Sequence, residues 1–402
     1  ARARAIGFSH FVSLGEHADV DFGDMLDYLA SDPKTRAILL YIESIESPRK
    51  FMSAARAAAR NKPVIVVKAG RSQQGQRAAA SHTGALAGSD MVYDAAIARA
   101  GMLRVDTLQQ LFLAAETLTR FRTTRCEELT ILTNGGGAGV MAADAAAHVG
   151  VALADLSEAT LRRLDALLPG NWSRGNPVDI IGDAPVERYV QALQALNDDP
   201  AAGAVLFIHA PVAIVSSAEI ARALVSALVS ARAASERQPT PRLMACWLGE
   251  AAVAEARQIF QDAGIPGYPT PEEAVRAFAM LVTYRRNQAL LLEVPATVSA
   301  STLASPDTVA VHALVRQVLA DGRDMLTEPE AKAVLSAYRI PVVATRGVAP
   351  QAEAAADAAQ AIGFPVALKI LSPDLSHKSD VGGVVLNLDS ATDVRTAEVQ
   401  NH

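Results

Sequence analysis

The sequence predicts an α/β protein built around two doubly wound parallel sheets. Short runs rich in Val, Ile and Leu alternate along the chain with alanine-rich segments of helical period. This alternation is typical of parallel strands that are covered by helices on both faces. The chain has 402 residues and 50% of them are hydrophobic, so it can bury the cores of two or three domains rather than one.

The strands and helices are predicted in three blocks. The first block contains two buried strands, at 37–42 and 63–68, with a helix from Pro48 to Arg60 between them. The second block follows a polar stretch and contains strands at 129–133, 204–208 and 243–247, then a long helix at 270–288. The third block contains a helix after Thr327, strands at 340–343, 365–370 and 384–388, and a helix at 353–362.

Composition argues against several kinds of partner. The 37 basic and 43 acidic residues give a net charge of −6, whereas a nucleic-acid-binding protein needs a basic excess. No apolar run reaches the roughly 18 residues of a membrane span, and the first residues do not form a signal peptide. Cys126 and Cys246 lack the spacing of a metal or redox pair, so we interpret them as packing residues in a reducing compartment. We therefore expect a soluble, cytoplasmic protein that binds neither nucleic acid nor membrane.

One histidine stands in a segment of small residues after the second predicted strand. His82 follows Ser81 and precedes Thr83 and Gly84. A neutral imidazole is a nucleophile near pH 7, and glycine lets the backbone approach a phosphate closely. The segment therefore suits a histidine that takes up and hands on an anionic group. A loop or helix-capping histidine is the alternative, and for a lone residue it is the commoner role.

A carboxylate is expected near this histidine. Glu43 directly follows the first predicted strand. The carboxyl ends of parallel strands and the loops that leave them form the ligand-binding edge of a sheet, so Glu43 and His82 should both lie there. An acceptor on one ring nitrogen fixes the tautomer and raises the basicity of the other. Glu43 either has this role or is a solvated loop carboxylate.

A glycine-rich turn links a strand of the second block to a helix. It begins at Asn134 and continues through Gly135, Gly136 and Gly137. The amides of such a turn can point at an anion, and the helix macrodipole favours negative charge there. The turn lacks the Lys-Ser/Thr ending of a nucleotide-binding loop. It is a phosphate-binding turn or a plain tight turn.

A second group of polar residues surrounds a strand end in the third block. Lys369 ends an apolar strand, which is an unusual place for a charge unless an anion lies nearby. A polar loop that contains His377 follows, and its last glycines, Gly382 and Gly383, could close over phosphates. A lysine that extends to solvent is the alternative, because strand-end lysines commonly do so.

Together these residues resemble the NDP-forming acyl-CoA synthetases, the ADP-forming acetate–CoA ligase family related to succinyl-CoA synthetase. The resemblance covers essentially the whole chain and is carried by segments 40–43, 68–72, 81–88, 134–139, 176–179 and 365–384. It implies that both doubly wound sheets are flavodoxin-like and succinyl-CoA-synthetase-like, and that an ATP-grasp domain begins after them. The implied divisions are ligase domains at 1–123 and 124–293, a linker and connecting helix at 294–326, and the ATP-grasp part at 327–402.

The resemblance also implies roles for the candidate residues. His82 would be phosphorylated during turnover, Glu43 would orient it, and His377 would ferry phosphate from the nucleotide. The phosphate-binding residues would be Ser81, Thr83, Gly84, Asn134, Gly135, Gly136 and Gly137. The residues that meet the nucleotide would be Lys369, Gly382 and Gly383.

The same resemblance implies the ligands. They are a carboxylic acid or acyl phosphate, CoA and ATP or GTP, with Mg²⁺ whose ligands would lie outside this chain. The family's CoA-binding Rossmann domain and the later part of its ATP-grasp domain are not in this sequence, so we expect a fragment that is inactive by itself. A homo-oligomer stays open.

An alternative function comes from a different class of protein. The linker and the tract at 284–288 also resemble bacterial fusions that carry a GNAT-type protein lysine acetyltransferase. In such a protein this chain would be a regulatory region that senses acyl-CoA or nucleotide. The presence of His82 favours the ligase, because many of the fusions lack the phosphorylated histidine.

Overall fold

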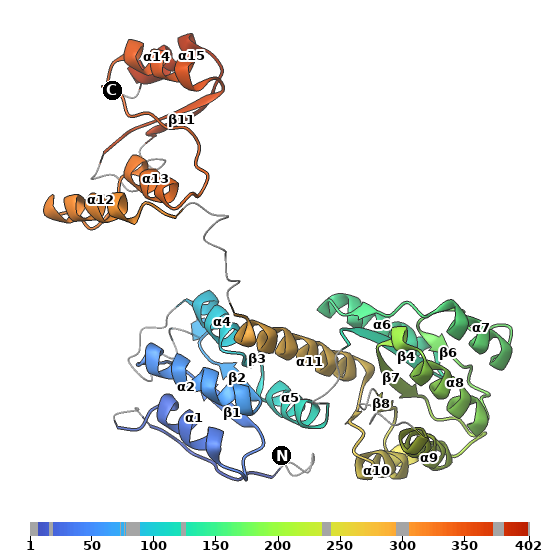
Figure 1. Cartoon of the computed structure of the whole chain (residues 1–402). Coiled ribbons are helices and arrows are strands. Elements are labelled where there is room, and N and C mark those ends of the chain that lie inside the picture. Colours follow the sequence, from blue (N-terminus) through green and yellow to red (C-terminus); the bar gives the residue numbers. More distant parts are fainter. Residues whose placement is uncertain are drawn as a thin grey trace. The chain divides into compact units, whose positions relative to one another are not determined.

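The computed structural model describes residues 7–15, 19–72, 74, 75, 77, 89–121, 126–234, 243–294, 305–372 and 382–400. The chain divides into two compact units, Ala1–Val294 and Pro295–His402, and Figure 1 shows their elements. Each unit is described by itself below.

The first sheet of unit Ala1–Val294 has three parallel strands: β1 (Ile38–Ile42), β2 (Val64–Lys68) and β3 (Leu103–Val105), in that order. Helices α1 (Phe22–Ser31), α2 (Pro48–Asn61) and α4 (Asp90–Arg99) pack against one face, and α5 (Leu108–Arg120) packs against the other. Val64 and Val66 of β2 pack in the core on the face of α1, α2 and α4, while Ile65 and Val67 pack in the core on the face of α5. This division follows from the alternation of side chains along a strand.

The second sheet of the same unit has six strands in the order β5-β4-β7-β8-β9, with β6 also paired to β4, and all pairs are parallel. The strands are β4 (Glu128–Thr133), β5 (Ala152–Leu153), β6 (Val178–Asp179), β7 (Ala204–His209), β8 (Leu243–Trp247) and β9 (Gly267–Tyr268). Helix α6 (Gly136–Val149) covers one face. The other face is covered by α7 (Glu158–Leu167), α8 (Val186–Asp198), α9 (Ser217–Ala234) and α10 (Ala254–Asp262). Both faces are therefore buried, which explains the nearly continuous apolar strands.

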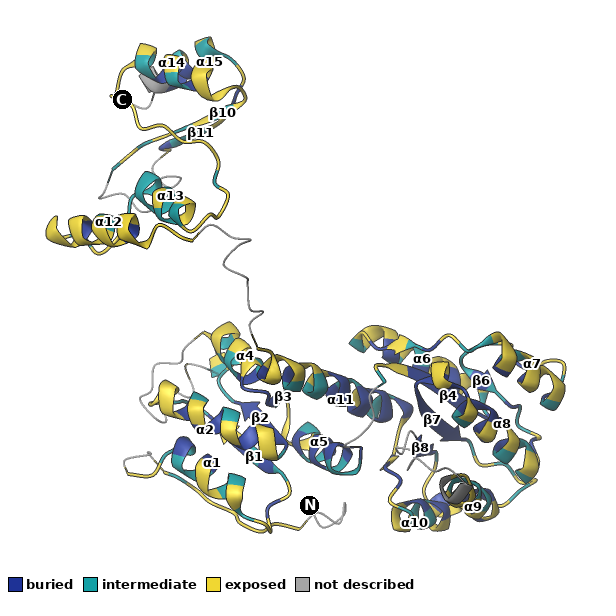
Figure 2. Ribbon diagram, viewed as in Figure 1, coloured by how far each residue is buried: buried dark blue, intermediate teal, exposed yellow. Residues whose placement is uncertain are grey.

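Helix α11 (Pro271–Leu292) joins the two sheets. It lies between them in Figure 1 and is largely buried in Figure 2, and one hydrophobic core contains residues of α11 and of strands from both sheets. The Asn287 side-chain amide donates to the Met102 carbonyl at 2.7 Å, and the Gln288 amide donates to the Gly101 carbonyl at 2.6 Å. The long helix thus fixes the first sheet to the second within one compact unit.

Unit Pro295–His402 is smaller. Its helices are α12 (Thr308–Ala320), α13 (Glu328–Ala337), α14 (Ala352–Ile362) and α15 (Ala391–Gln400), and its strands are β10 (Val366–Lys369) and β11 (Val384–Leu388). The two strands pair antiparallel. The core of this unit is formed by Ala355, Ala356, Ala359, Leu388, Val394 and Ala397.

The structure confirms the α/β class with parallel sheets, and every strand predicted from the sequence is present except one. The strand predicted at 340–343 is wrong, because this run is irregular. Ile340 and Val343 are 49% and 74% exposed, so the apolar residues there have no sheet face to cover, and Pro341 lacks the amide that a strand ladder needs. No helix among the described residues is long and apolar enough to cross a membrane.

Candidate functional site

The carboxyl edge of the first sheet collects charged side chains. Glu43 comes directly after β1 and is half-buried. Burial and the Glu43 carboxylate together raise the pKa of Tyr41, whose hydroxyl hydrogen-bonds that carboxylate. Glu43 therefore stands at the edge where the sequence predicts it, next to a phenol that the prediction did not include.

Lys68 ends β2 beside Glu43 and is only 3% exposed. Its ammonium lies 4.6 Å from the centre of the Tyr93 ring on α4 and donates to the carbonyl of Ala69. Burial lowers the pKa of Lys68, and the neighbouring Asp90 carboxylate opposes that effect. Lys68 is thus a nearly buried cation at the same edge of the sheet as Glu43.

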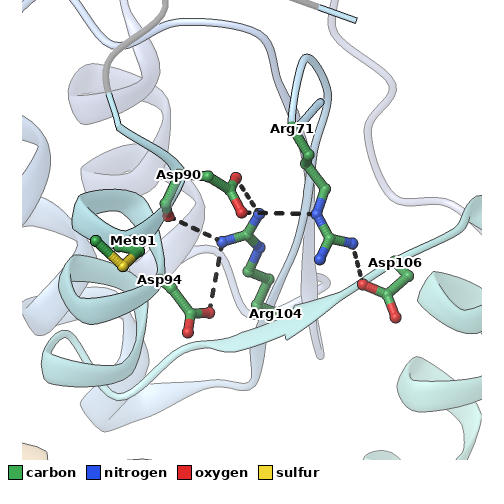
Figure 3. Close-up of a pocket in the computed structure, with 6 residues that line it drawn as sticks. All are labelled: Arg71, Asp90, Met91, Asp94, Arg104 and Asp106. Atoms are coloured by element: carbon green, nitrogen blue, oxygen red, sulfur yellow. Dashed lines mark hydrogen bonds and ion pairs between the residues drawn. The ribbon is translucent and has the colours of Figure 1, made fainter. Parts of the chain in front are cut away.

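Five alternating charges continue from this edge, as Figure 3 shows. Asp94 contacts Arg104 at 3.4 Å, Arg104 contacts Asp90 at 2.5 Å, and the Asp90 carboxylate lies 3.8 Å from Nε of Arg71. Arg71 also pairs with Asp106. Because every arginine already has a carboxylate partner, this chain of charges organises the protein itself and does not offer a free cation to a ligand.

A small hollow of about 210 Å³ opens beside these charges, lined by Arg71, Asp90, Met91, Asp94, Arg104 and Asp106. Arg71 precedes the segment that contains His82, and Asp90 follows it. His82 itself lies outside the described residues, together with Ser81, Thr83, Gly84 and His377. The predicted contact between Glu43 and His82 therefore stays a prediction.

The glycine-rich turn is held firmly at its first residue. Asn134 is 3% exposed. Its side-chain amide donates to the carbonyl of Ala210 at 2.8 Å, and its side-chain oxygen accepts from the amide of the same residue at 2.9 Å. The Gly135 amide donates to the Thr133 hydroxyl at 3.0 Å. Asn134 is thus a structural anchor that joins the end of β4 to the end of β7.

The exposed part of this turn begins helix α6 at Gly136. The first amides of a helix have no partner within the helix, and Gly136 and Gly137 are exposed to solvent, so their amides can meet a ligand. A carboxylate lies close by, since a Cβ added to Gly136 would be 2.9 Å from Oδ2 of Asp179. Any phosphate at this turn has to tolerate that negative charge.

A buried histidine supports the same end of the sheet. His209 ends β7 and is completely buried. Its Nε2 lies 3.1 Å from the Ser217 hydroxyl and its Nδ1 lies 3.5 Å from the Tyr189 hydroxyl. Burial lowers the pKa of His209 to about 4. His209 is therefore neutral at physiological pH and helps to fix the strand end to which Asn134 is bonded.

Lys369 in the smaller unit is held by a carboxylate. Its ammonium lies 3.0 Å from Oε1 of Glu328, at the start of α13, and Lys332 contacts the same oxygen at 2.8 Å. Hydrogen bonds from Lys332 and then Lys369 lower the pKa of Glu328 to about 2. Gly383 lies beside this group, because its carbonyl accepts from the Ile370 amide at 2.9 Å, and Gly382 has a φ of 71°. The structure thus brings together Lys369, Gly382 and Gly383.

Several charged residues of these sites were not assigned from the sequence. Arg104 and Asp90 meet across the start of α4, and Lys332 and Glu328 meet beside Lys369. Arg104 left one signal, since it is a charge inside the apolar run Met102 to Val105. The described residues contain no group of three or more His, Cys, Asp or Glu that could hold a metal ion.

Comparisons with known proteins match this arrangement. The family model described as succinyl-CoA ligase like flavodoxin domain matches residues 1–118, the ligase-CoA domain matches residues 129–292, and an ATP-grasp domain matches residues 317–400. The chain thus has the domains of the succinyl-CoA ligase type, followed by an ATP-grasp domain.

Individual relatives extend over almost the whole chain. The chain is 39% identical over 388 residues to an ADP-forming acetate–CoA ligase I of Archaeoglobus fulgidus. The alignment covers 96% of this chain and 53% of the relative. It is 32% identical over 399 residues to an ADP-forming 4-hydroxybutyrate–CoA ligase of Nitrosopumilus maritimus. That alignment covers 99% of this chain and 55% of the relative.

A solved structure agrees with these relatives. The acetyl-coenzyme A synthetase 1 of Ca. Korarchaeum cryptofilum in complex with phosphate and ADP is 34% identical, with a TM-score of 0.66 and coverage of 73% of this chain and 63% of that one. The chain belongs to the NDP-forming acyl-CoA synthetase family. It spans about half the length of the two curated relatives named above.

Proposed function

We propose that this chain is the core of an acid–CoA ligase that forms a nucleoside diphosphate. A nitrogen of His377 attacks the γ-phosphorus of ATP, and the bond to the bridging oxygen breaks so that ADP leaves. A nitrogen of His82 then attacks the same phosphorus, and the bond to His377 breaks, which restores the His377 imidazole. The phosphohistidine then passes its phosphoryl group to a carboxylate, which gives an acyl phosphate and restores the imidazole. The CoA sulfur attacks the acyl carbon, phosphate leaves, and the thiol proton goes to solvent.

The observation that carries this proposal is the set of groups at one edge of the first sheet. Glu43, the nearly buried Lys68 and both ends of the segment that contains His82 meet there. Phosphoryl transfer requires mainly positioning and compensation of charge. A carboxylate that can orient an imidazole and a cation that can face a phosphoryl group supply both.

The nucleotide side of the proposal rests on Lys369. In this structure its charge is satisfied by Glu328, which Lys332 also contacts. Nucleotide phosphates would compete with Glu328 for the ammonium groups of Lys332 and Lys369. Gly382 and Gly383 directly precede the strand residue that pairs with Lys369. We propose His377 as the carrier between this unit and His82, as the family resemblance implies.

The substrates are proposed by class. The relatives are named for acetate and 4-hydroxybutyrate, so a small carboxylic acid is the expected acyl donor, with CoA and ATP or GTP. We also propose a cytoplasmic location. Mg²⁺ is expected from the family, but the described residues do not gather ligands for it, and no step above is assigned to a metal.

Labelling of the full-length protein with γ-labelled ATP tests the proposal. The label should be acid-labile and base-stable, and His82→Ala should leave at most a transient label on His377. His377→Ala should slow labelling from ATP but leave labelling from acyl-CoA and labelled phosphate largely intact, because the second route bypasses the nucleotide. Lys369→Ala should weaken nucleotide binding. Equal labelling of the wild type and His82→Ala would refute the ligase mechanism.

A further inference from the structure

We propose that Arg104 is a positioning residue for the segment that carries His82, and that it acts through Asp90. The inference rests on the proposed phosphoryl transfer at His82. Arg71, Asp90 and Arg104 are called the loop-end cluster below, because Arg71 and Asp90 stand on either side of that segment. Nothing in the sequence patterns assigns a role to Arg104.

Arg104 starts from a rigid place. It is the middle residue of β3 and pairs in register with Val66 of β2. Its neighbours Leu103 and Val105 are buried in the core between the sheets, so the alternation of a strand directs Arg104 to the opposite face, which α4 covers. Its side chain is only 10% exposed.

The guanidinium of Arg104 holds the first residue of α4 at two points. Nη2 contacts the Asp90 carboxylate at 2.5 Å and Nη1 donates to the Asp90 carbonyl at 3.3 Å. The same carboxylate lies 3.8 Å from Nε of Arg71. Arg71 and Asp90 are therefore joined to each other and, through Arg104, to strand β3.

The energetic cost indicates that this placement is not incidental. Nε of Arg104 is buried and has no hydrogen-bond partner. Such groups are rare in native proteins, because a buried donor without a partner destabilises the fold. The fork of Arg104 is thus directed at the start of α4 although one of its own donors stays unsatisfied.

A fixed loop end matters for the proposed chemistry. Phosphoryl transfer needs the attacking nitrogen in line with the phosphorus, and a misplacement of about 1 Å can cost about a hundredfold in rate. A fixed separation between its two ends reduces the number of conformations that a connecting segment can adopt. Arg104 would then act on His82 without touching the substrate.

The chain offers a matched control on the same helix. Asp90 and Asp94 both contact Arg104, but Asp94 is 70% exposed and contacts neither Arg71 nor the segment end. Asp94→Asn removes a carboxylate partner of Arg104 and leaves the loop-end cluster in place. Asp90→Asn removes the charge that joins the two ends.

The experiment compares the rate of His82 labelling by γ-labelled ATP in the full-length protein at saturating nucleotide. Arg104→Met and Asp90→Asn should each lower the rate roughly 10- to 100-fold, with the KM for ATP almost unchanged, because the nucleotide is bound by the other unit. Arg104→Lys should recover part of the rate, since it keeps the charge and loses the fork. The double variant should be no slower than the slower single variant, and Asp94→Asn should label like the wild type.

Several results would overturn the inference. Wild-type labelling in a folded Arg104→Met protein is one, and equal losses in Asp90→Asn and Asp94→Asn are another. If Arg104→Met does not fold, the Asp90 and Asp94 pair decides the question, since both side chains are accessible and keep their shape on substitution. Labelling of His82→Ala at the wild-type level would instead refute the proposed function, so the two failures are distinguishable.

Discussion

Two strand-to-helix connections in unit Ala1–Val294 are fixed in different ways. After β4, Asn134 makes two uncharged hydrogen bonds to Ala210 and the chain turns directly into α6. After β2, the chain runs from Arg71 to Asp90 before α4 begins, and its ends are joined by ion pairs to each other and to Arg104.

The difference follows from the length of the connections. A tight turn has few conformations, so two hydrogen bonds inside it are enough to specify one of them. A longer connection costs more entropy to close, and its ends must be held by groups that reach across a larger space, as the long arginine side chains do. Uncharged bonds are insensitive to salt, whereas exposed ion pairs are screened by it.

The largest expected effect is a pH dependence of stability that comes from His209, at the strand end to which Asn134 of the uncharged turn is bonded. The pKa of His209 falls from 6.5 to about 4 on folding, so below pH 6.5 the unfolded chain takes up a proton that the native chain refuses. Stability should therefore decrease as the pH falls from 6.5 to 4, by roughly 3 kcal/mol in total, and His209 should contribute no further change below that range. Urea unfolding at several pH values measures the slope, and His209→Gln should flatten it. A slope that persists in the variant would assign the effect to other groups.

Removal of the turn's anchor should have the next largest effect. Asn134→Ala leaves the amide and the carbonyl of Ala210 without their partner, which should lower the free energy of unfolding by about 2 kcal/mol. Urea unfolding at low and at high salt provides the measurement, and the loss should be equal in both. A salt-dependent loss would show that the turn is not held by uncharged bonds alone.

A charge beside the turn should control its affinity for anions. Asp179→Asn keeps an acceptor for the Ile181 amide, now bonded to Oδ1 at 2.9 Å, and removes the negative charge near Gly136. If phosphate binds at this turn, its affinity should rise about fivefold, which corresponds to about 1 kcal/mol. Calorimetry with inorganic phosphate tests this.

Asp183→Asn is the control for that measurement, because Asp183 is paired with Arg188 at 2.7 Å and should not influence the turn. Unchanged phosphate affinity in both variants would favour a plain tight turn over a phosphate-binding one.

The smallest effect should come from the exposed part of the other connection. Arg71→Gln removes ion pairs to Asp90 and Asp106 and should cost about 0.5 kcal/mol of stability at low salt and less at about 1 M salt. Arg162→Gln, which breaks an exposed pair with Glu158 on α7, is the surface reference. Equal losses in both variants would remove the distinction between Arg71 and any surface arginine.

Local patterns in the sequence determined a large part of this protein. The periods of two and of about 3.6 residues depend only on neighbours along the chain, so strands such as 63–68 and 204–208 and the helix from Pro271 were predictable. The same is true of the glycine turn, whose residues are contiguous. The strand predicted at 340–343 was wrong because apolar residues form a buried strand only where a sheet and its covering face are present. Whether they are present is not decided by neighbours along the chain.

Only the tertiary structure decided which charges meet. Arg104 contacts Asp90 because β3 pairs with β2 in a fixed register and α4 covers the face of the sheet to which Arg104 points. Asp179 approaches Gly136 because β6 pairs with the end of β4, and Lys369 meets Glu328 across a separation of 41 residues. Register and packing over such distances depend on the sum of many weak contacts, so no segment of the sequence specifies them by itself.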